Sequence, residues 1–389
     1  MRRYLSLLRG LEQPSTLRLV NSGWRSTPRR NEIHAVYRTF QTSAPRQAFF
    51  MTPLARGLVA IGARLTRSWW KRLTPERKAA MRDALGRRKG LIYGGVGVLA
   101  LGSVGFYYSH VEKTPVTGRK RFLMFSREDV IKLIADEREE LVKELVGNQS
   151  LLSHNHPSYQ YALSVISQIL GKNWDTWGPL FEGLNWSLYV VDSPVVNAVC
   201  LPSGEIFVFS GLLKACRNKE ELGFILSHEV SHAVLGHGVE ALSQRGIIDF
   251  VMLFLVATIW AIVPNDLVSY FLHGWSHSTA EFLFHLPYSR QLESEADKVG
   301  LLFAANACFE PETAAKVWQH LPAPGIDNDE VAEYFSTHPN HARRYEQLSA
   351  LMPSARAVWK ENRCELMREE VEGFQASVSR ILKKAFKFW

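Results

Sequence analysis

The 389-residue sequence predicts a mainly α fold with a small β-sheet, which places it in the α+β class. Two observations support this prediction. Apolar residues recur at helical spacing through much of the chain after residue 115, most plainly between residues 220 and 236. Only two short segments, 186–191 and 205–209, read as strands. The length leaves room for one sizeable domain with appendages.

The amino end is strongly basic. Residues 1–89 contain twenty Lys or Arg and four acids, a net charge of +16, whereas the whole chain carries +8. An Arg- and Ser-rich start with few acids is typical of a mitochondrial presequence. We expect this presequence at 1–47, with processing between about 39 and 48, and a basic matrix-side segment at 48–89. Nucleic-acid binding is the usual alternative for a basic arm, but no DNA- or RNA-binding signature accompanies it.

Residues 90–109 form an uncharged stretch just long enough to cross a bilayer. Three basic residues, 87–89, precede it, and Glu112 and Lys113 roughly cancel each other on its far side. The positive-inside rule therefore leaves the amino end in the matrix and sends the rest of the chain into the intermembrane space. A buried core helix is the alternative, and it fits poorly with six glycines in the stretch.

The next region should contain two helices and two strands. Ser126, followed by two acids, predicts a capped helix running to about Val146, and a second helix is expected at roughly Ser158–Leu170. The strands are Trp186–Val191 and Glu205–Phe209, and we expect the latter to lie at a sheet edge. An edge strand binds an extended peptide through its backbone, largely irrespective of side chains.

The sequence His228-Glu229-Val230-Ser231-His232 is the strongest candidate for a metal site. In a helix, the two histidines lie on one face, so both imidazoles reach one metal. Glu229 lies about 100° around that helix, where it can hold and deprotonate a water. Histidines on an apolar buried helix are costly without partners, although backbone or carboxylate partners are the alternative. His237 is about 140° off the ligand face and is expected at a helix end.

The third ligand must come from a later segment, and the helix predicted at 288–307 supplies it. Glu293 and Asp297 share one face of this helix, and Glu295 is rotated about 200° from Glu293, so only one glutamate faces the metal. We choose Glu293 because Asp297 can then orient a ligand histidine. Gly300 would let the two helices approach closely. Three protein ligands leave the fourth position of the metal open for water. The alternative for the acidic residues of this helix is a solvated surface without a metal.

These motifs occur together with Thr337-His338-Pro339 and with a strand-and-turn stretch at 197–213. Residues 115–350 thereby resemble the CAAX-prenyl-protease/HtpX family of zinc metallopeptidases. Within that family they are most similar to the branch of stress-activated metalloendopeptidases of the mitochondrial inner membrane, whose activity overlaps that of the matrix-facing AAA protease.

The resemblance implies a gluzincin-type metallopeptidase domain at 115–352, with an amino-terminal membrane anchor. It also implies one Zn²⁺ per chain, held by His228, His232 and Glu293, with Glu229 as the base. A histidine at the place of His338 lies near the metal in this family. It would either donate a hydrogen bond to the oxyanion or occupy the open zinc position and keep the enzyme latent. A histidine satisfied within its own loop is the alternative.

The function implied is cleavage of membrane-anchored proteins in stress response and quality control, including a dynamin-like fusion GTPase. The site would face the intermembrane space from the inner membrane. A non-cleaving chaperone or scaffold that uses the same cleft is the alternative, although the intact Glu229 argues against it. A CAAX-type processing enzyme is a third option, which the single firm membrane span weakens.

The remaining segments allow more than one reading. The apolar run 246–263 is long enough to span, but a single span would separate His232 from Glu293, and 266–285 is too polar for a second. We expect 246–285 to be a hairpin on or in the bilayer surface, or packed against another protomer. Helices are also expected at 311–320, 329–335 and 341–351, and in the terminal segment 353–389, which either binds inner-membrane lipid or packs on the domain. The four cysteines are Cys200, Cys216, Cys308 and Cys364. Their spacing is not that of a metal site, and the sequence does not reveal which of them pair.

Overall fold

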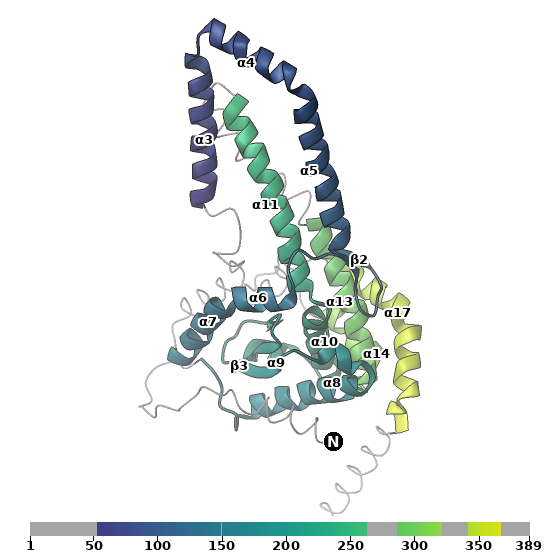
Figure 1. The fold of residues 1–389 in the computed structure, drawn as a ribbon. Coiled ribbons are helices and arrows are strands. Elements are labelled where there is room, and N and C mark those ends of the chain that lie inside the picture. The colour runs from purple at the N-terminus through teal and green to yellow at the C-terminus, as the bar shows by residue number, and fades with distance from the viewer. Residues whose placement is uncertain (1–52, 149, 263–285, 321–340, 367–389) are drawn as a thin grey trace, which may run out of the picture. The chain divides into compact units, whose positions relative to one another are not determined.

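The computed structural model describes residues 53–148, 150–262, 286–320 and 341–366 (Figure 1). Within these residues the chain is mostly helical with small sheets, which confirms the predicted fold class. They belong to two compact units. Of the described residues, the first contains those in 140–235 and from 292 to 366, and the second contains those in 53–139 and 236–291.

The first unit begins with a long helix that the sequence underestimated. Helix α8 (Pro157–Phe181) starts at the cap residue His156 and extends past Leu170 to a kink at Trp177. Asn173 explains the extension, because its side-chain amide donates to the carbonyls of Ile169 and Phe303. A residue that favours turns is thus held inside the helix by a tertiary partner.

The sheet of this unit has the order β3-β5-β4, from β3 (Ser187–Val191), β4 (Ala198–Cys200) and β5 (Glu205–Phe209). The expectation that 205–209 is an edge strand was wrong. It pairs in parallel with β3 on one side and antiparallel with β4 on the other. Every residue of β5 is buried, as a strand covered on both sides requires. The edge strands are β3 and β4, and Leu151 bridges to the outer side of β3.

Helices make up the rest of the unit. They are α9 (Ser210–Ala215), α10 (Lys219–Leu235), α13 (Leu286–Asn306, whose first residues precede the unit), α14 (Pro311–Ala315), α15 (Val317–His320) and α17 (His341–Glu361). The helix predicted at 311–320 is interrupted at Lys316. Conversely, α17 passes through Pro353, where the sequence predicted a break. Buried Ala355 and Trp359 hold the far half of α17 in the core, which offsets the hydrogen bond lost at the proline. The helix predicted at 329–335 lies outside the described residues.

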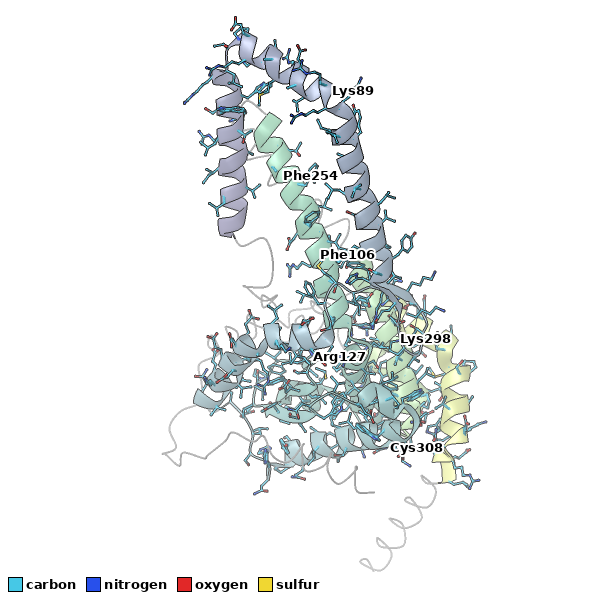
Figure 2. All side chains as sticks on the ribbon, in the orientation of Figure 1. Lys89, Phe106, Arg127, Phe254, Lys298 and Cys308 are labelled. Atoms are coloured by element: carbon cyan, nitrogen blue, oxygen red, sulfur yellow. A yellow bond between two sulfur atoms is a disulfide. The ribbon has the colours of Figure 1, made fainter. Side chains whose placement is uncertain are left out.

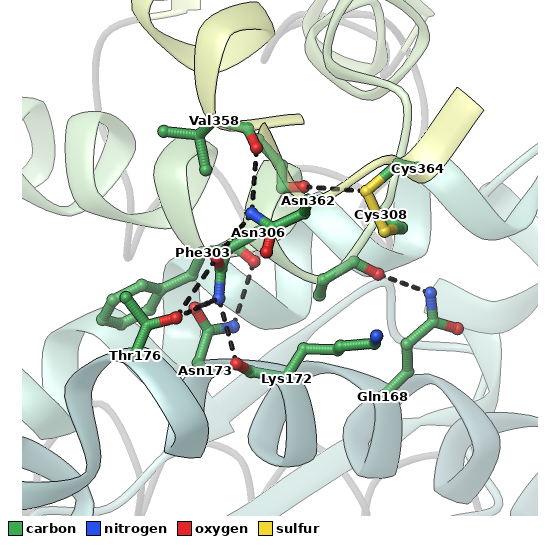
Figure 3. The surroundings of a disulfide bond; sticks show 12 residues. Gln168, Lys172, Asn173, Thr176, Phe303, Asn306, Cys308, Val358, Asn362 and Cys364 are labelled. Carbon is green, nitrogen blue, oxygen red and sulfur yellow. Dashed lines mark hydrogen bonds between the residues drawn. A yellow bond between two sulfur atoms is a disulfide. The ribbon is translucent and has the colours of Figure 1, made fainter. Parts of the chain in front are cut away.

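A disulfide and a set of buried asparagines tie α8, α13 and α17 together (Figure 3). Cys308, just after α13, is bonded to Cys364, just after α17. Asn306 donates to the Asn173 side chain on α8 and accepts a hydrogen bond from the Asn362 side chain. Because these partners are far apart in the chain, only the tertiary structure could reveal the pairing.

The second unit contains α3 (Pro53–Arg72), α4 (Pro75–Arg87), α5 (Lys89–Ser109) and α11 (His237–Ile262). Helix α5 matches the predicted span: it is long and apolar enough to cross a membrane, and none of its residues is buried. Figure 2 shows Lys89 and Phe106 near its two ends. Helix α3 packs along α11. The terminal helix predicted at 353–389 falls mostly outside the described residues.

Several local predictions for this unit meet the structure directly. Ser126 caps α6 (Arg127–Leu133) through a reciprocal bond with Asp129, but the helix breaks at Ile134 before α7 (Ala135–Gly147). The hairpin of β1 (Val111–Lys113) and β2 (Lys120–Phe122) was not predicted. Helix α11 begins nine residues before the apolar run, and residues 263–285 of the expected hairpin lie outside the described residues.

A buried ion pair fixes the start of α11. Glu240 is fully buried, and both of its oxygens accept hydrogen bonds from Arg119, at 2.6 and 2.7 Å. Arg119 lies in the connection between β1 and β2. Because a lone buried carboxylate is costly, this bidentate pair holds the hairpin and the first turn of α11 together.

Candidate metal centre

Helices α10 and α13 bring three metal-binding side chains to one point. His228 and His232 lie one turn apart on α10, and Glu293 comes from α13. The Nε2 atoms of the two histidines are 3.1 Å apart. Each Nε2 also lies 3.4 Å from an oxygen of Glu293. Among the described residues this is the one group of histidine, cysteine and acidic side chains with metal-ligand spacing.

The group is deeply set but open on one side. The His228 side chain is fully buried and Glu293 is nearly so, whereas His232 exposes 17% of its side chain. Most residues of α10 are buried on every side, including the apolar ones around the histidines. A site of this kind holds its ligands rigidly, and His232 is the ligand side chain that is most exposed.

Gly300 permits the close contact between the two helices, as the sequence predicted. A Cβ atom at this position would lie 2.8 Å from the Cα and 2.9 Å from the backbone nitrogen of His228. Both distances are shorter than backbone atoms tolerate, so any side chain here would push α13 away from α10. The glycine therefore sets the distance at which Glu293 reaches the histidines.

Asp297 and Arg344 form a second layer behind His228. An Asp297 oxygen lies 3.1 Å from His228 Nδ1, and the Arg344 guanidinium donates to both oxygens of Asp297, at 2.7 and 2.6 Å. Protonated Nδ1 of His228 donates to Asp297, which directs Nε2 toward His232 and Glu293. The carbon at the centre of the guanidinium also lies 3.8 Å from the ring centroid of Trp318.

Sequence reasoning missed Arg344, although a signal was present. On α17 the buried residues Arg344, Leu348, Ala355 and Trp359 share one face. An arginine in the register of a buried apolar stripe needs a buried acid as its partner. Only the fold identifies that acid as Asp297.

The charges of this layer shift two pKa values. Burial by itself would lower the pKa of His228, but hydrogen bonds to the carboxylates of Asp297 and Glu293 outweigh it and raise the pKa to about 9. Burial would likewise raise the pKa of Asp297, but Arg344 and His228 hold it below its ordinary value. Without a metal, His228 is therefore held as an imidazolium between carboxylates.

The other described residues that the sequence suggested for the site lie outside the ligand group. Glu229 is buried on α10 beside His228 in the chain, at 3% exposure. Glu295 is buried but does not belong to the ligand group. Gly236 adopts a φ of 73°, which ends α10, and His237 is the first residue of α11. His338 lies outside the described residues, so its role stays a prediction.

Comparisons with known proteins cover this region. The model of "Peptidase family M48" matches residues 178–352. The chain is 36% identical to "Metalloendopeptidase OMA1, mitochondrial" of Bos taurus, over 84% of this chain and 64% of that protein. It is 34% identical to the protein of that name from Danio rerio, over 82% and 68% of the two chains. "Mitochondrial metalloendopeptidase OMA1" of Saccharomyces cerevisiae is 30% identical, over 69% and 77%. The chain thus spans slightly less than two thirds of the Bos taurus relative.

Proposed function

Because the chain belongs to peptidase family M48, as its motifs predicted, we propose that it is a zinc-dependent endopeptidase of the mitochondrial inner membrane. Family membership implies a metal, usually zinc. The observation that carries the proposal is the spacing of the ligand groups: the two Nε2 atoms are 3.1 Å apart, and each lies 3.4 Å from a different oxygen of Glu293. Tetrahedral zinc with bonds of about 2.0–2.1 Å places neighbouring ligand atoms roughly 3.3 Å apart. His228, His232 and Glu293 therefore fit one Zn²⁺ without rearrangement.

Each residue of the centre has a separate task in peptide-bond hydrolysis. When bound, zinc supplies a Lewis acid that polarises the scissile carbonyl and lowers the pKa of water toward about 7. Glu229 accepts the proton of the attacking water and delivers it to the leaving amine. Asp297 holds His228 in the tautomer that presents Nε2, and Arg344 holds Asp297. A role for His338 at the oxyanion or at the open zinc position remains part of the proposal.

The sheet suggests how a polypeptide is bound. Strand β4 packs on α10, the helix that carries the two histidines. Asn197 and Leu201 bond to β5 through their backbones, so the alternate residues Ala198 and Cys200 direct theirs to the outer edge, where the Ala198 N–H donates to the Asn197 side chain at 2.8 Å. Leu151 bridges to the other edge strand, β3, and β4 pairs only with β5 among the described residues. We therefore place an extended substrate along β4 rather than along β5, where its backbone would take the place of the Asn197 side chain on the Ala198 N–H.

The amino end supports the proposed location, and the family resemblance suggests the substrates. Helix α5 has the length and composition of a span, with three basic residues on its amino side. That asymmetry supports an orientation with the amino end in the matrix and the metal centre in the intermembrane space. Membrane-anchored proteins, including a dynamin-like fusion GTPase, are the proposed substrates, and stress-linked quality control is the proposed role. The mitochondrial relatives support the compartment.

The proposal is tested by zinc content and cleavage of a membrane-anchored substrate, measured side by side on the reconstituted chain. Glu229→Gln should keep zinc and lose cleavage by at least about a hundredfold, because only the base is removed. Glu293→Ala should lose both. Glu220→Gln, the same chemical change in the first turn of α10, is the matched control and should leave both unchanged. Undiminished cleavage by Glu229→Gln would refute the mechanism.

A further inference from the structure

Helix α3 carries an exposed apolar stripe that the membrane span does not explain. Each of the four residues exposes between 50% and 63% of its surface: Leu58, Ile61, Leu65 and Trp69. Their spacing places them on one side of the helix. The partly buried side chains Val59, Ala63 and Trp70 lie roughly 120° away, on the side from which α3 packs along α11. The stripe therefore faces away from the partner that α3 already has.

The charge of α3 indicates what covers the stripe. The helix has five basic residues and no acid, and Lys71 and Arg72 form its last turn. Trp69 and Trp70 lie beside these charges, with ring centroids 6.5 Å apart. Basic residues together with tryptophan at one end of an apolar stripe are the pattern of a helix at the headgroup level of an anionic membrane.

Helix α11, the partner of α3, is also apolar on its exposed side. Its exposed large apolar residues are Phe250, Val251, Phe254 and Leu255, and Figure 2 shows Phe254 on this helix. Helix α5 of the same unit is apolar and exposed along its length. Lipid is the single medium that suits all three helices, whereas a second copy of the chain would have to match each surface separately.

The length of the stripe limits how far α3 can enter the bilayer. From Leu58 to Trp69 the helix rises about 16 Å, which is about half of a hydrocarbon core of roughly 30 Å. Arg64 and Arg67 lie within this stretch and Arg56 lies just before it, so charges along the helix would oppose a full crossing. The stripe is therefore suited to one leaflet, with the arginine side chains reaching to the headgroups.

We propose that α3 is a membrane-inserted wedge, which enters the matrix-side leaflet beside α11 and binds anionic phospholipid through its basic end. Because α3 packs along α11, this proposal puts the apolar part of α11 inside the bilayer as well, rather than in a hairpin on its surface as expected for 246–285. The segment 48–89 would then be a membrane element rather than only a basic segment in the matrix. This inference rests on the proposed function in one respect, because it takes α5 to be the span.

The test uses the full chain in liposomes with single added cysteines that carry an environment-sensitive fluorophore. The native free thiols are poor targets, because Cys200 is buried and burial raises the pKa of the Cys216 thiol. Labels are placed at Leu65→Cys on the stripe, Val98→Cys on α5 as the lipid reference, and Ala80→Cys on exposed α4 as the aqueous reference. Unmodified chain measures background labelling.

We expect a lipid-borne quencher to reduce emission from position 65 as much as from position 98, and to leave position 80 unaffected. Omitting anionic phospholipid should weaken the quenching at 65 but not at 98. Quenching of position 65 by aqueous iodide, or energy transfer between labels at 65 on two chains without lipid quenching, would overturn the wedge. If position 98 also fails to report lipid, the span itself is refuted. Cleavage activity enters none of these outcomes.

Discussion

At the scale of single residues, the position of His228, a proposed zinc ligand, depends on a side chain outside the ligand group. Arg344 binds Asp297 with two hydrogen bonds, and Asp297 orients His228. Arg344→Lys keeps the charge but loses the planar pair of donors. We expect zinc affinity to fall about 10–100-fold, as happens when an outer-shell partner of a ligand is lost. Competition with a fluorescent chelator measures it.

Arg356→Lys is the matched control for this prediction, because it makes the same change on the exposed side of α17. Its zinc affinity should equal that of the unmodified chain. Equal affinities for Arg344→Lys and Arg356→Lys would show that Arg344 does not position the ligand.

His228 also predicts a pH dependence for the metal-free protein. The pKa of His228 is about 9 in the folded protein, compared with 6.5 for an ordinary histidine such as one in the unfolded chain. The raised folded pKa means that the stabilisation is complete below pH 6.5 and disappears as the pH rises through about 9. In the presence of a chelator, the free energy of unfolding should therefore decrease by up to a few kcal/mol as the pH rises through this window. Denaturant unfolding at several pH values measures it.

His228→Gln isolates this effect, because all other titrating groups remain. Its free energy of unfolding should vary less across the same window, and identical curves for the two proteins would contradict the assignment. Zinc reverses the sign, because a ligand histidine must be neutral. Zinc affinity should consequently rise with pH over the interval in which the metal-free protein loses stability.

At the scale of elements, β4 presents alternate backbone groups to a bound peptide. Ala198 and Cys200 direct their backbones to the outer edge, where a peptide would replace the Asn197 side chain on the Ala198 N–H, whereas their neighbours bond to β5. A substrate peptide methylated at one backbone nitrogen that pairs with β4 should show a KM raised about 3–10-fold, the cost of one lost hydrogen bond. Moving the methyl group by one residue should restore the KM. A series of such peptides, assayed for cleavage, would show no two-residue periodicity if the substrate is bound elsewhere.

At the scale of the whole molecule, the Cys308–Cys364 disulfide closes a loop of 56 residues around α14, α15 and α17. Replacing both cysteines by alanine should lower the free energy of unfolding by about 2–4 kcal/mol, because the unfolded chain regains its freedom. Thermal unfolding with and without reductant measures this effect. The metal centre should retain zinc, since hydrogen bonds of Asn173, Asn306 and Asn362 still join the same helices.

Cys216→Ala is the control for this prediction, because Cys216 is a free and partly buried cysteine. Reductant should lower the unfolding temperature of this variant, as it does that of the unmodified chain, but not that of the double alanine variant. An equal shift in all three proteins would mean that the disulfide is not the source of the stabilisation.

The sequence by itself determined the features that depend on neighbours along the chain. Helical periodicity placed His228 and His232 on one face, composition identified the apolar stretch that became α5, and Ser126 with Asp129 defined a helix start. In each case the interacting groups are within a few turns of one another, so local geometry is sufficient.

Only the tertiary structure decided the features that join distant segments. Strand β5 is central because β4 pairs with it, and α17 continues through Pro353 because its far half is buried. Arg344 binds Asp297, which lies 47 residues away in the chain. The pairing of Cys308 with Cys364 belongs to the same class. Such contacts depend on how whole elements pack, and packing free energy is summed over many weak contacts that no local pattern of residues records.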